Sequence, residues 1–266
     1  MKISIITLSF NQAPFLEQAL RSVLDQDHPN VEYIVVDPGS TDGSRDLLER
    51  YRSRINQLIL EPDQGPADGL NKGFSVATGA IYGFLNADDY FLPGALARVD
   101  KAFSEIPEKD VISGHTLIVD ESGNPINRFY SRCFSLRGYV HEAAFLAQPA
   151  TFFRSDAFKR TGGFNLNNRV AWDGELWVDL ALARARFGLV PNFLSAFRLY
   201  GNSITGSGRM GAAYRMHMDE MFQKIMGRPF RRADRLTALA LKATQYARQP
   251  RIVVDRLRYG APFPKR

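Results

Sequence analysis

Two adjacent carboxylates close a short run of small and apolar residues. Asp88 and Asp89 end the tetrapeptide Asn86-Ala87-Asp88-Asp89, which follows the apolar stretch 80–85. That stretch is typical of a buried strand, and ligands of open α/β sheets bind where such strands end. Two neighbouring negative charges repel each other unless a cation compensates, and carboxylates suit hard ions such as Mg²⁺ or Mn²⁺. A solvated turn that caps the next helix is the alternative.

Three more polar clusters follow apolar runs in the first third of the chain. They span 9–11, 37–44 and 63–72, and each comes directly after a segment that we expect to be a strand. Together with 86–89 they make four polar loops. Because the carboxyl ends of parallel strands meet at one edge of a sheet, we expect these loops to form a cleft.

The hydrophobic pattern predicts the elements that position these loops. Strands are expected at 3–7, 31–36, 58–60 and 80–85, alternating with helices near 14–24, 44–51, 67–77 and 93–103. Such alternation predicts an α/β fold with a mostly parallel central sheet and helices on both faces. The second half is less regular: a strand at 111–119, a hairpin partner at 126–130, a helix within 171–187, a β-rich stretch at 189–199 and helix from about 210 onward.

Length and composition limit the class of protein. The 266 residues are 45% hydrophobic, which suits one large domain or one domain with an appendage. No segment approaches the roughly 18 apolar residues that span a bilayer, and the N-terminal run is too short for a secretory signal. Cys133 is the one cysteine, so we expect no intrachain disulfide and a cytoplasmic setting.

The positive charge is concentrated at the end of the chain. From Arg228 to Arg266 there are eleven lysine and arginine residues against two aspartates, a net charge of +9, whereas the whole sequence carries +6. This tail also carries an apolar stripe of Leu236, Leu239, Ala240 and Ala243. The stripe and the charge together predict binding to an anionic membrane surface, and a solvated helical face is the alternative.

Five blocks along the chain carry a resemblance to a known family. The blocks are Ile5-Ile6-Thr7-Leu8-Ser9-Phe10-Asn11, Val36-Asp37-Pro38-Gly39-Ser40-Thr41-Asp42-Gly43, Asp63-Gln64-Gly65 with Asn71-Lys72-Gly73, Asn86-Ala87-Asp88-Asp89, and Ala171-Trp172-Asp173-Gly174-Glu175-Leu176-Trp177. In this order they resemble the inverting nucleotide-sugar glycosyltransferases of family 2, which include cellulose, chitin and hyaluronan synthases. The resemblance covers roughly residues 2–203.

The resemblance implies a fold and a division of the chain. It predicts a GT-A fold over 1–205, with a nucleotide-binding half at 1–105 and an acceptor-binding half at 106–205, followed by a basic helical extension at 206–266. The implied function is metal-dependent, inverting transfer of a sugar from a nucleotide diphosphate to a hydroxyl of a saccharide or lipid-linked acceptor. Bacterial surface polysaccharide or glycoconjugate biosynthesis is the implied setting.

The resemblance also assigns the donor side of the site. Asp37 would accept a hydrogen bond from the base of a UDP, GDP or dTDP donor, although Pro38 stands where relatives commonly carry a second aspartate. Asp89 would be the direct ligand of Mn²⁺ or Mg²⁺, and Asp88 would contact ribose or metal-bound water. Tyr200 stands where some relatives carry a metal- or phosphate-binding histidine. The predicted nucleotide-binding residues are Thr7, Ser9, Asn11, Asp37, Lys72 and Asp88.

Asp173 is the expected general base, because relatives use the acidic residue of this block to deprotonate the acceptor hydroxyl. Glu175 is the competitor, and in a helix the two side chains cannot both face the cleft. An acidic helix N-terminus without catalytic role is the alternative. The predicted acceptor side consists of Gln148, Trp172 and Glu175.

Other classes of protein explain fewer of these features. A nucleotidyltransferase also uses paired carboxylates, but residues 8–11 do not form the glycine-rich, basic loop that holds a triphosphate. A non-catalytic binding or scaffold protein on the same fold remains an alternative. No Gly-x-Gly-x-x-Gly follows the first strand, so a dehydrogenase is not expected, and no readout motif predicts nucleic-acid binding. Without membrane spans or a Gln-x-x-Arg-Trp motif, single addition is preferred to processive synthesis.

Overall fold

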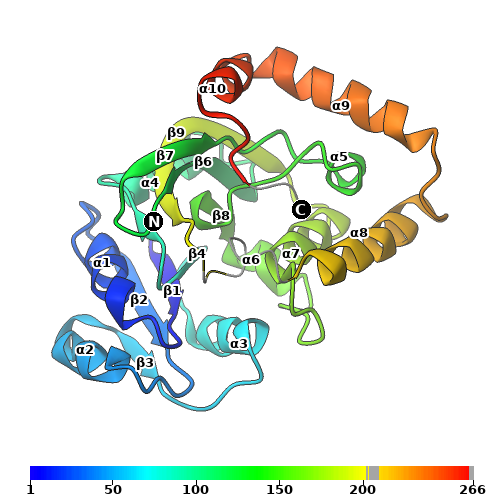
Figure 1. Ribbon diagram of the computed structural model, residues 1–266. Helices are drawn as coiled ribbons and strands as arrows, with labels where there is room; N and C mark the ends of the chain where they lie inside the picture. Colours follow the sequence, from blue (N-terminus) through cyan, green and yellow to red (C-terminus); the bar gives the residue numbers. More distant parts are fainter. Residues whose placement is uncertain (202, 204–209, 264–266) are drawn as a thin grey trace.

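A single mixed sheet forms the centre of the molecule (Figure 1). The computed structural model describes residues 1–201, 203 and 210–263. In the described part the strands are β1 (Ile3–Leu8), β2 (Val31–Val36), β3 (Gln57–Ile59), β4 (Ile81–Asn86), β5 (Tyr90–Phe91), β6 (Val111–Val119), β7 (Pro125–Phe129), β8 (Thr151–Arg154) and β9 (Phe187–Arg198). Their order across the sheet is β3-β2-β1-β4-β8-β6-β9-β5, and β7 pairs with β6.

The helices lie between and after these strands. They are α1 (Ala13–Leu24), α2 (Ser44–Arg50), α3 (Pro66–Val76), α4 (Ala95–Glu105), α5 (Leu136–Val140), α6 (Ser155–Lys159), α7 (Trp172–Leu182), α8 (Gly211–Met226), α9 (Asp234–Arg248) and α10 (Arg251–Tyr259), with short 3-10 helices η1 (Arg52–Arg54) and η2 (Gln148–Ala150). Among the described residues, none of the helices combines the length and apolar character that crossing a bilayer requires.

The first half of the sheet is parallel, as the alternation of strands and helices predicts. β1 pairs in parallel with both β2 and β4, and β2 pairs in parallel with β3. The second half is mixed, because β8 enters antiparallel between β4 and β6 while β9 runs parallel to β6. The α/β fold class is therefore confirmed, with a sheet that is entirely parallel from β3 to β4 and mixed beyond β4.

Helices cover both faces of the sheet, as expected. On one face, side chains of α1, α2 and α4 pack against Ile3 and Ile5 of β1. On the other face, α3, α6 and α7 pack against Ile6 and the aromatic residues around Phe74. Alternate residues of β1 thus point into opposite layers of the core. The loop after β1 is not part of either layer and can contribute to a site.

Two strands of the second half have unusual features. β8 lies within the predicted acceptor half, 106–205, and its Phe152 and Phe153 are fully buried in the two cores. β9 continues through Pro191, because its pairing with β6 shifts register between Ser113 and Thr116. Proline has no backbone N–H to donate to a neighbouring strand. Because the register shift places Pro191 in a bulge, no such hydrogen bond is required of it.

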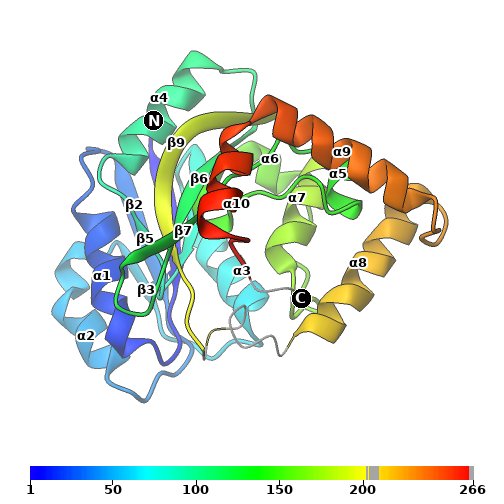
Figure 2. The same ribbon diagram turned by 45° about the horizontal axis from the view of Figure 1, so that its top comes forward.

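The C-terminal helices run back along the body. In both views α9 forms the outer edge and leads from α8 to α10, which lies beside β7 (Figures 1 and 2). The predicted boundary between 205 and 206 falls in the interval 204–209, outside the described residues, as does Asn202. The helical character expected from about residue 210 is confirmed over α8, α9 and α10.

Candidate active site

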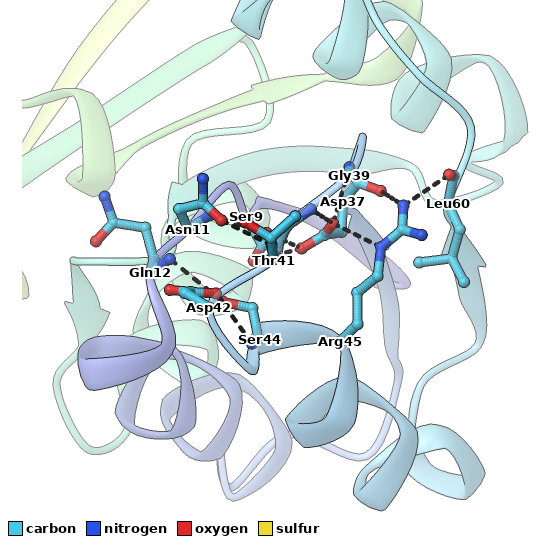
Figure 3. A network of polar contacts seen from close by, with 11 residues as sticks. Ser9, Asn11, Gln12, Asp37, Gly39, Thr41, Asp42, Ser44, Arg45 and Leu60 are labelled. Carbon is cyan, nitrogen blue, oxygen red and sulfur yellow. Dashed lines mark hydrogen bonds and ion pairs between the residues drawn. The ribbon is translucent and has the colours of Figure 1, made fainter.

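Asp37 is the centre of a polar network at the carboxyl end of β2 (Figure 3). Its Oδ1 accepts hydrogen bonds from the backbone N–H groups of Gly39 and Ser40, and its Oδ2 accepts from the hydroxyls of Ser9 and Ser40. Burial alone would raise the pKa of Asp37, but the hydrogen bonds from Ser40, Arg45 and Gly39 outweigh it and hold this pKa below its ordinary value. The carboxylate is therefore charged and shapes its own loop.

This geometry bears on the predicted base contact. The Asp37 side chain has no exposed surface, and Ser9 is buried beside it. A nucleotide base can reach the carboxylate only if one of these internal donors is exchanged for the base. Direct recognition of the base by Asp37 stays a prediction, whereas its role in holding the loop is visible.

Arg45 is a site residue that sequence reasoning missed. Its Nε lies 3.2 Å from Asp37 Oδ1, and its terminal nitrogen donates to the backbone carbonyls of Asp37 and Leu60, at 3.0 Å each. Arg45 thereby ties the loop after β2 to the end of β3. An available signal was its place in the first turn of α2, where the helix dipole disfavours cations.

The loop after β1 interlocks with the loop after β2. The Asn11 backbone N–H donates to the Ser40 hydroxyl at 2.8 Å, and Asn11 Oδ1 accepts from the Thr41 N–H at 2.9 Å. Asp42 accepts the N–H of Ala13 at 2.9 Å and so supplies the cap that α1 lacks from its own chain. These bonds fix the outline of the predicted nucleotide pocket.

Thr7, a predicted nucleotide-binding residue, lies away from this pocket. Its side chain is fully buried and its hydroxyl accepts a hydrogen bond from Tyr33 at 2.9 Å. Thr7 follows Ile3 and Ile5 on the face of β1 that packs against α1, so strand periodicity turns it into the core. The Thr7 side chain is thus engaged with Tyr33, and a nucleotide contact by Thr7 stays a prediction. Phe10, two residues beyond the strand, is instead 58% exposed at the pocket loop.

Asp88 and Asp89 lie at the end of β4, as predicted. Asp88 is half-buried, whereas Asp89 is only 1% exposed. Asp89 Oδ1 accepts the backbone N–H of Arg198 at 2.9 Å, and its Oδ2 is a buried oxygen without a hydrogen-bond partner among the described residues. Burial, and then the charge of Asp88, raises the pKa of Asp89 well above its ordinary value.

Arg198 anchors this pair from β9. Its guanidinium donates to the backbone carbonyls of Asp88, Asp120 and Glu121 and to Gln18, while only 2% of the residue is exposed. These donors face mostly neutral carbonyls, so Arg198 compensates the two carboxylates at a distance and leaves Asp89 Oδ2 open. Arg198 was not recognised as a site residue from the sequence.

The donor set of this pair fits a divalent cation. An unpartnered buried carboxylate oxygen beside a second carboxylate is costly unless a positive charge neutralises both. In the part of the chain that the structure describes, no three His, Cys, Asp or Glu side chains converge on one position. Asp88 and Asp89 would therefore hold the ion together with oxygens from outside the protein, as Mg²⁺ sites do when the ligand is a phosphate.

Tyr200 reaches the same pair from beyond β9. Its hydroxyl donates to Asp88 Oδ2 at 3.2 Å, and the Gln12 amide donates to that hydroxyl at 3.3 Å. Burial, and then the charge of Asp88, raises the pKa of Tyr200 to about 12, so the hydroxyl remains protonated at neutral pH. A hydrogen-bond donor thus stands where the resemblance predicted a histidine in some relatives.

Lys72 and Arg169 are the cations on the α3 side. Lys72 Nζ donates to the Pro62 carbonyl at 2.5 Å and lies 3.4 Å from Asp68 Oδ2, so it holds the loop before α3. Arg169 is exposed, and a Cβ placed on Gly65 would lie 3.0 Å from one of its terminal nitrogens. Lys72, the predicted phosphate contact, is engaged internally, whereas Arg169 was missed.

The N-terminus of α7 packs against β4. Trp172, the first residue of α7, has its ring centroid 5.6 Å from that of Phe84 in β4. Asp173 is the second residue of α7 and is half-buried. This ring contact joins the first turn of α7, which carries the predicted general base, to the strand that precedes Asp88 and Asp89, although 84 positions separate Asp89 from Asp173 in the sequence.

Glu175 is held inside the protein. Its two carboxylate oxygens accept hydrogen bonds from the side-chain amides of Asn165, at 3.0 Å, and Asn168, at 2.6 Å. The Asn168 carbonyl oxygen accepts the N–H groups of Val170 and Ala171, directly before α7. Glu175 is 8% exposed, and its bonds to Asn165 and Asn168 hold the start of α7 in place. That Glu175 faces the acceptor stays a prediction.

Gln148 is similarly engaged. It is 8% exposed and its amide donates to the Phe84 carbonyl at 2.9 Å, so it joins η2 to β4. This bond explains a polar residue in the sheet centre, since a buried amide needs a partner. That Gln148 lines the acceptor surface stays a prediction.

Comparisons with known proteins agree with this architecture. The profile of "Glycosyl transferase family 2" matches residues 4–161. A putative teichuronic acid biosynthesis glycosyltransferase of Bacillus subtilis, TuaG, is 35% identical over 223 residues, which cover 77% of this chain and 82% of TuaG. An uncharacterized glycosyltransferase of Nostoc sp. is 35% identical over 131 residues, which cover 46% of this chain and 41% of that protein.

Solved structures share the fold. TarS 1–349 of S. aureus in complex with UDP-GlcNAc has a TM-score of 0.67 at 20% identity, with coverage of 94% of this chain and 73% of that one. The mannosyltransferase PcManGT of Pyrobaculum calidifontis in complex with GDP-Man and Mn²⁺ has a TM-score of 0.65 at 21% identity, with coverage of 94% and 75%. The family profile and the TuaG match together establish that this chain belongs to glycosyltransferase family 2.

Proposed function

We propose that this chain transfers a sugar from a nucleotide diphosphate to a hydroxyl of a saccharide or lipid-linked acceptor, with inversion at the anomeric carbon. The observation that carries the proposal is the packing of Trp172, at the start of α7, against Phe84 of β4: Asp173 directly follows Trp172, and Asp88 and Asp89 lie just after β4. An inverting displacement requires a base on the side of the anomeric carbon opposite the leaving group, and therefore an acidic residue separate from those that hold the diphosphate.

Asp173 acts as the general base in this proposal. It accepts the proton of the acceptor hydroxyl as that oxygen forms a bond to the anomeric carbon, while the bond from this carbon to the diphosphate oxygen breaks and the nucleoside diphosphate leaves. Negative charge then collects on the diphosphate. A divalent cation, Mn²⁺ or Mg²⁺, would neutralise that charge when bound. Asp88 and Asp89 would hold it, and the exposed guanidinium of Arg169 would approach the same oxygens.

The donor is proposed to be a UDP-, GDP- or dTDP-sugar. The solved relatives that carry UDP-GlcNAc or GDP-Man support a nucleotide-sugar donor without deciding the base. Phe10, 58% exposed beside the Asp37 network, would offer a ring on which a base can stack. Ser9 and Asn11 would act indirectly, through the loop that they hold.

The acceptor and the cellular setting are further parts of the proposal. The name of TuaG, a putative teichuronic acid biosynthesis glycosyltransferase, supports a surface polysaccharide or glycoconjugate acceptor. We place the reaction in the cytoplasm, consistent with a single cysteine in the sequence. In this proposal residues 1–105 form the donor half, residues 106–205 form the acceptor half, and residues 206–266 form the extension.

The test measures transfer itself. Full-length protein is incubated with UDP-, GDP- or dTDP-sugars and lipid-linked or free saccharide acceptors, with Mn²⁺ or with EDTA, and release of nucleoside diphosphate is measured together with the anomeric configuration of the product by NMR. Metal-dependent release with a β-linked product from an α-linked donor supports the proposal. Retained configuration, or nucleotide binding without release for any donor, would contradict it and favour a non-catalytic binding protein.

A further inference from the structure

The two last helices expose apolar side chains to solvent. α9 is 15 residues long, yet its buried residues are only Asp234 and Gln245, both polar. Leu236 and Leu239 of α9 are 71% and 64% exposed. On a helix of a globular domain the apolar residues normally face the core, so α9 presents its apolar stripe in the opposite direction.

Polar bonds, rather than an apolar core, hold α9 on the body. The Gln245 amide donates to the Cys133 carbonyl at 2.9 Å, and Gln245 Oε1 accepts the Cys133 N–H at 3.2 Å. Gln249, directly after the helix, donates to the Ser131 carbonyl at 3.0 Å. These specific bonds fix which side of α9 faces inward, and consequently that Leu236 and Leu239 face outward.

α10 adjoins α9 and repeats the pattern. The Arg256 guanidinium lies over the Tyr246 ring at 5.6 Å from the centroid, which joins the two helices. Val254 and Leu257 of α10 are 61% and 85% exposed. The two helices adjoin at the edge of the molecule (Figure 2), and each carries exposed apolar side chains and exposed arginines. We call the exposed side of α9 and α10 the terminal-helix face: Leu236, Leu239, Val254 and Leu257 with the exposed arginines of the same two helices.

The acidic residues of this segment are turned inward. Asp234 accepts two hydrogen bonds from the Arg228 guanidinium, at 2.8 Å each, and Asp255 accepts from Tyr130 at 2.6 Å and lies 3.2 Å from Arg128. Both are buried. Among the described residues of this segment, every exposed charged side chain is positive: Arg231, Arg232, Arg235, Arg248, Arg251, Arg256 and Arg258.

We propose that the terminal-helix face binds the surface of a membrane that contains anionic lipid. Such a surface offers apolar chains for the leucines and negative headgroups for the arginines at the same time. A second copy of this chain fits less well, because two such faces would bring like charges together. Nucleic acid would match the arginines but leave the leucines exposed. The proposal adds a partner and does not depend on the glycosyl transfer proposed above.

The test is flotation of the full chain with vesicles. Vesicles of phosphatidylglycerol and phosphatidylcholine are compared with vesicles of phosphatidylcholine alone, at low and high salt, without nucleotide. Leu236→Gln/Leu239→Gln removes apolar area and keeps a good helix former, and Arg232→Gln/Arg235→Gln removes charge. We expect binding only to anionic vesicles, at least tenfold weaker in each double variant and weakened by salt.

Matched controls carry the same chemistry on other surfaces. Val76→Gln/Leu182→Gln replaces apolar residues that are 41% and 49% exposed elsewhere, and Arg50→Gln/Lys101→Gln removes two charges from α2 and α4. These variants should float like the wild type. The proposal is overturned if the leucine double variant floats as well as the wild type, or if anionic vesicles bind nothing. It is also overturned if the leucines instead drive a dimer in analytical ultracentrifugation. Nucleotide affinity is measured in parallel. Because it does not depend on vesicle binding, loss of flotation with unchanged nucleotide affinity concerns the membrane proposal alone and not the proposed transfer.

Discussion

The hydroxyl of Tyr200 donates a hydrogen bond to Oδ2 of Asp88 across 3.2 Å, which links the segment after β9 to the carboxylate pair at the end of β4. The same hydroxyl also meets Gln12 at the start of α1, and the Tyr200 ring packs 5.1 Å from Phe15. Three segments that are distant in the sequence therefore converge on Asp88. The orientation of the Asp88 carboxylate therefore depends on a hydrogen bond from a neutral group, the Tyr200 hydroxyl.

Tyr200→Phe is expected to weaken nucleotide–metal binding about fivefold, since a lost hydrogen bond of this kind is worth about 1 kcal/mol. Calorimetric titration with UDP and GDP in the presence of Mn²⁺ measures the change. Tyr51→Phe is the matched control, because Tyr51 also donates to a carboxylate, Glu17, at 2.7 Å but far from β4. Equal affinities in wild type and Tyr200→Phe would show that this bond does not position Asp88 for the ligand.

Asp173→Asn should abolish transfer while donor binding persists. An amide cannot accept the acceptor proton, so we expect kcat to fall by about 10²–10⁴-fold, the usual contribution of a general base. The measurement is kcat for sugar transfer alongside the Kd for nucleotide diphosphate. A variant with more than a tenth of wild-type kcat would remove Asp173 from the role of base.

Glu175→Gln should act on stability instead. One oxygen of the carboxylate becomes an amide that faces the amide of Asn165 or Asn168, which leaves a buried donor unsatisfied and costs about 1–3 kcal/mol of unfolding free energy. Denaturant unfolding measures this loss. If Glu175→Gln kept its stability and lost transfer to the extent expected of Asp173→Asn, the assignment of the two acids would be reversed.

Substitutions of the two cations near α3, Arg169 and Lys72, should likewise have different effects, one on donor binding and the other on stability. Arg169→Gln is expected to raise the donor KM several-fold, because the exposed guanidinium is available to a diphosphate. Lys72→Gln should instead lower thermal stability, since Lys72 bonds the Pro62 carbonyl and faces Asp68. Donor KM and melting temperature of both variants are compared. A larger KM effect for Lys72→Gln would restore it as the phosphate contact.

Glu32 gives a prediction for acid unfolding. Burial alone would raise its pKa, but hydrogen bonds from Lys2, Ser4 and Thr78 lower it from 4.5 to about 2. A depressed folded-state pKa stabilises the fold above the unfolded value, and this contribution disappears as pH falls from 4.5 to about 2. It amounts to about 3 kcal/mol.

Glu32→Gln should therefore lower the unfolding free energy at pH 7 and flatten its slope between pH 4.5 and 2. Denaturant unfolding at several pH values measures both. Glu105→Gln, which alters an exposed pair with Lys101, should leave the slope unchanged. Parallel curves for wild type and Glu32→Gln would show that Glu32 titrates normally in the folded protein.

The sequence predicted the parts of the structure that follow from local pattern. Alternating strands and helices over the first hundred residues placed Asp37, Asp88 and Asp89 at strand ends, where the structure has them. Helical spacing also identified the stripe of Leu236 and Leu239. These features depend on residues close together in the chain.

What depends on tertiary contacts could not be predicted. Whether Thr7 faces a pocket or Tyr33 depends on which layer covers that face of β1. The sequence predicted Glu175 and Gln148 as site residues. In the structure the amides of Asn165 and Asn168 bond Glu175, and Gln148 bonds the backbone carbonyl of Phe84. Conversely, Arg45 and Arg198 gain their roles from carbonyls that are remote in sequence, which no local pattern reveals.

The most direct test of the account is calorimetric titration of UDP, GDP and dTDP into wild type and Asp88→Asn, each with Mn²⁺ and with EDTA. Asp88→Asn removes the repulsion on Asp89, so the variant should fold and its melting temperature serves as the check. The account predicts binding that requires the metal, prefers one base and weakens at least tenfold in the variant. Equal binding with EDTA, equal binding by the variant, or no binding of any nucleotide would contradict the donor site proposed at Asp88 and Asp89.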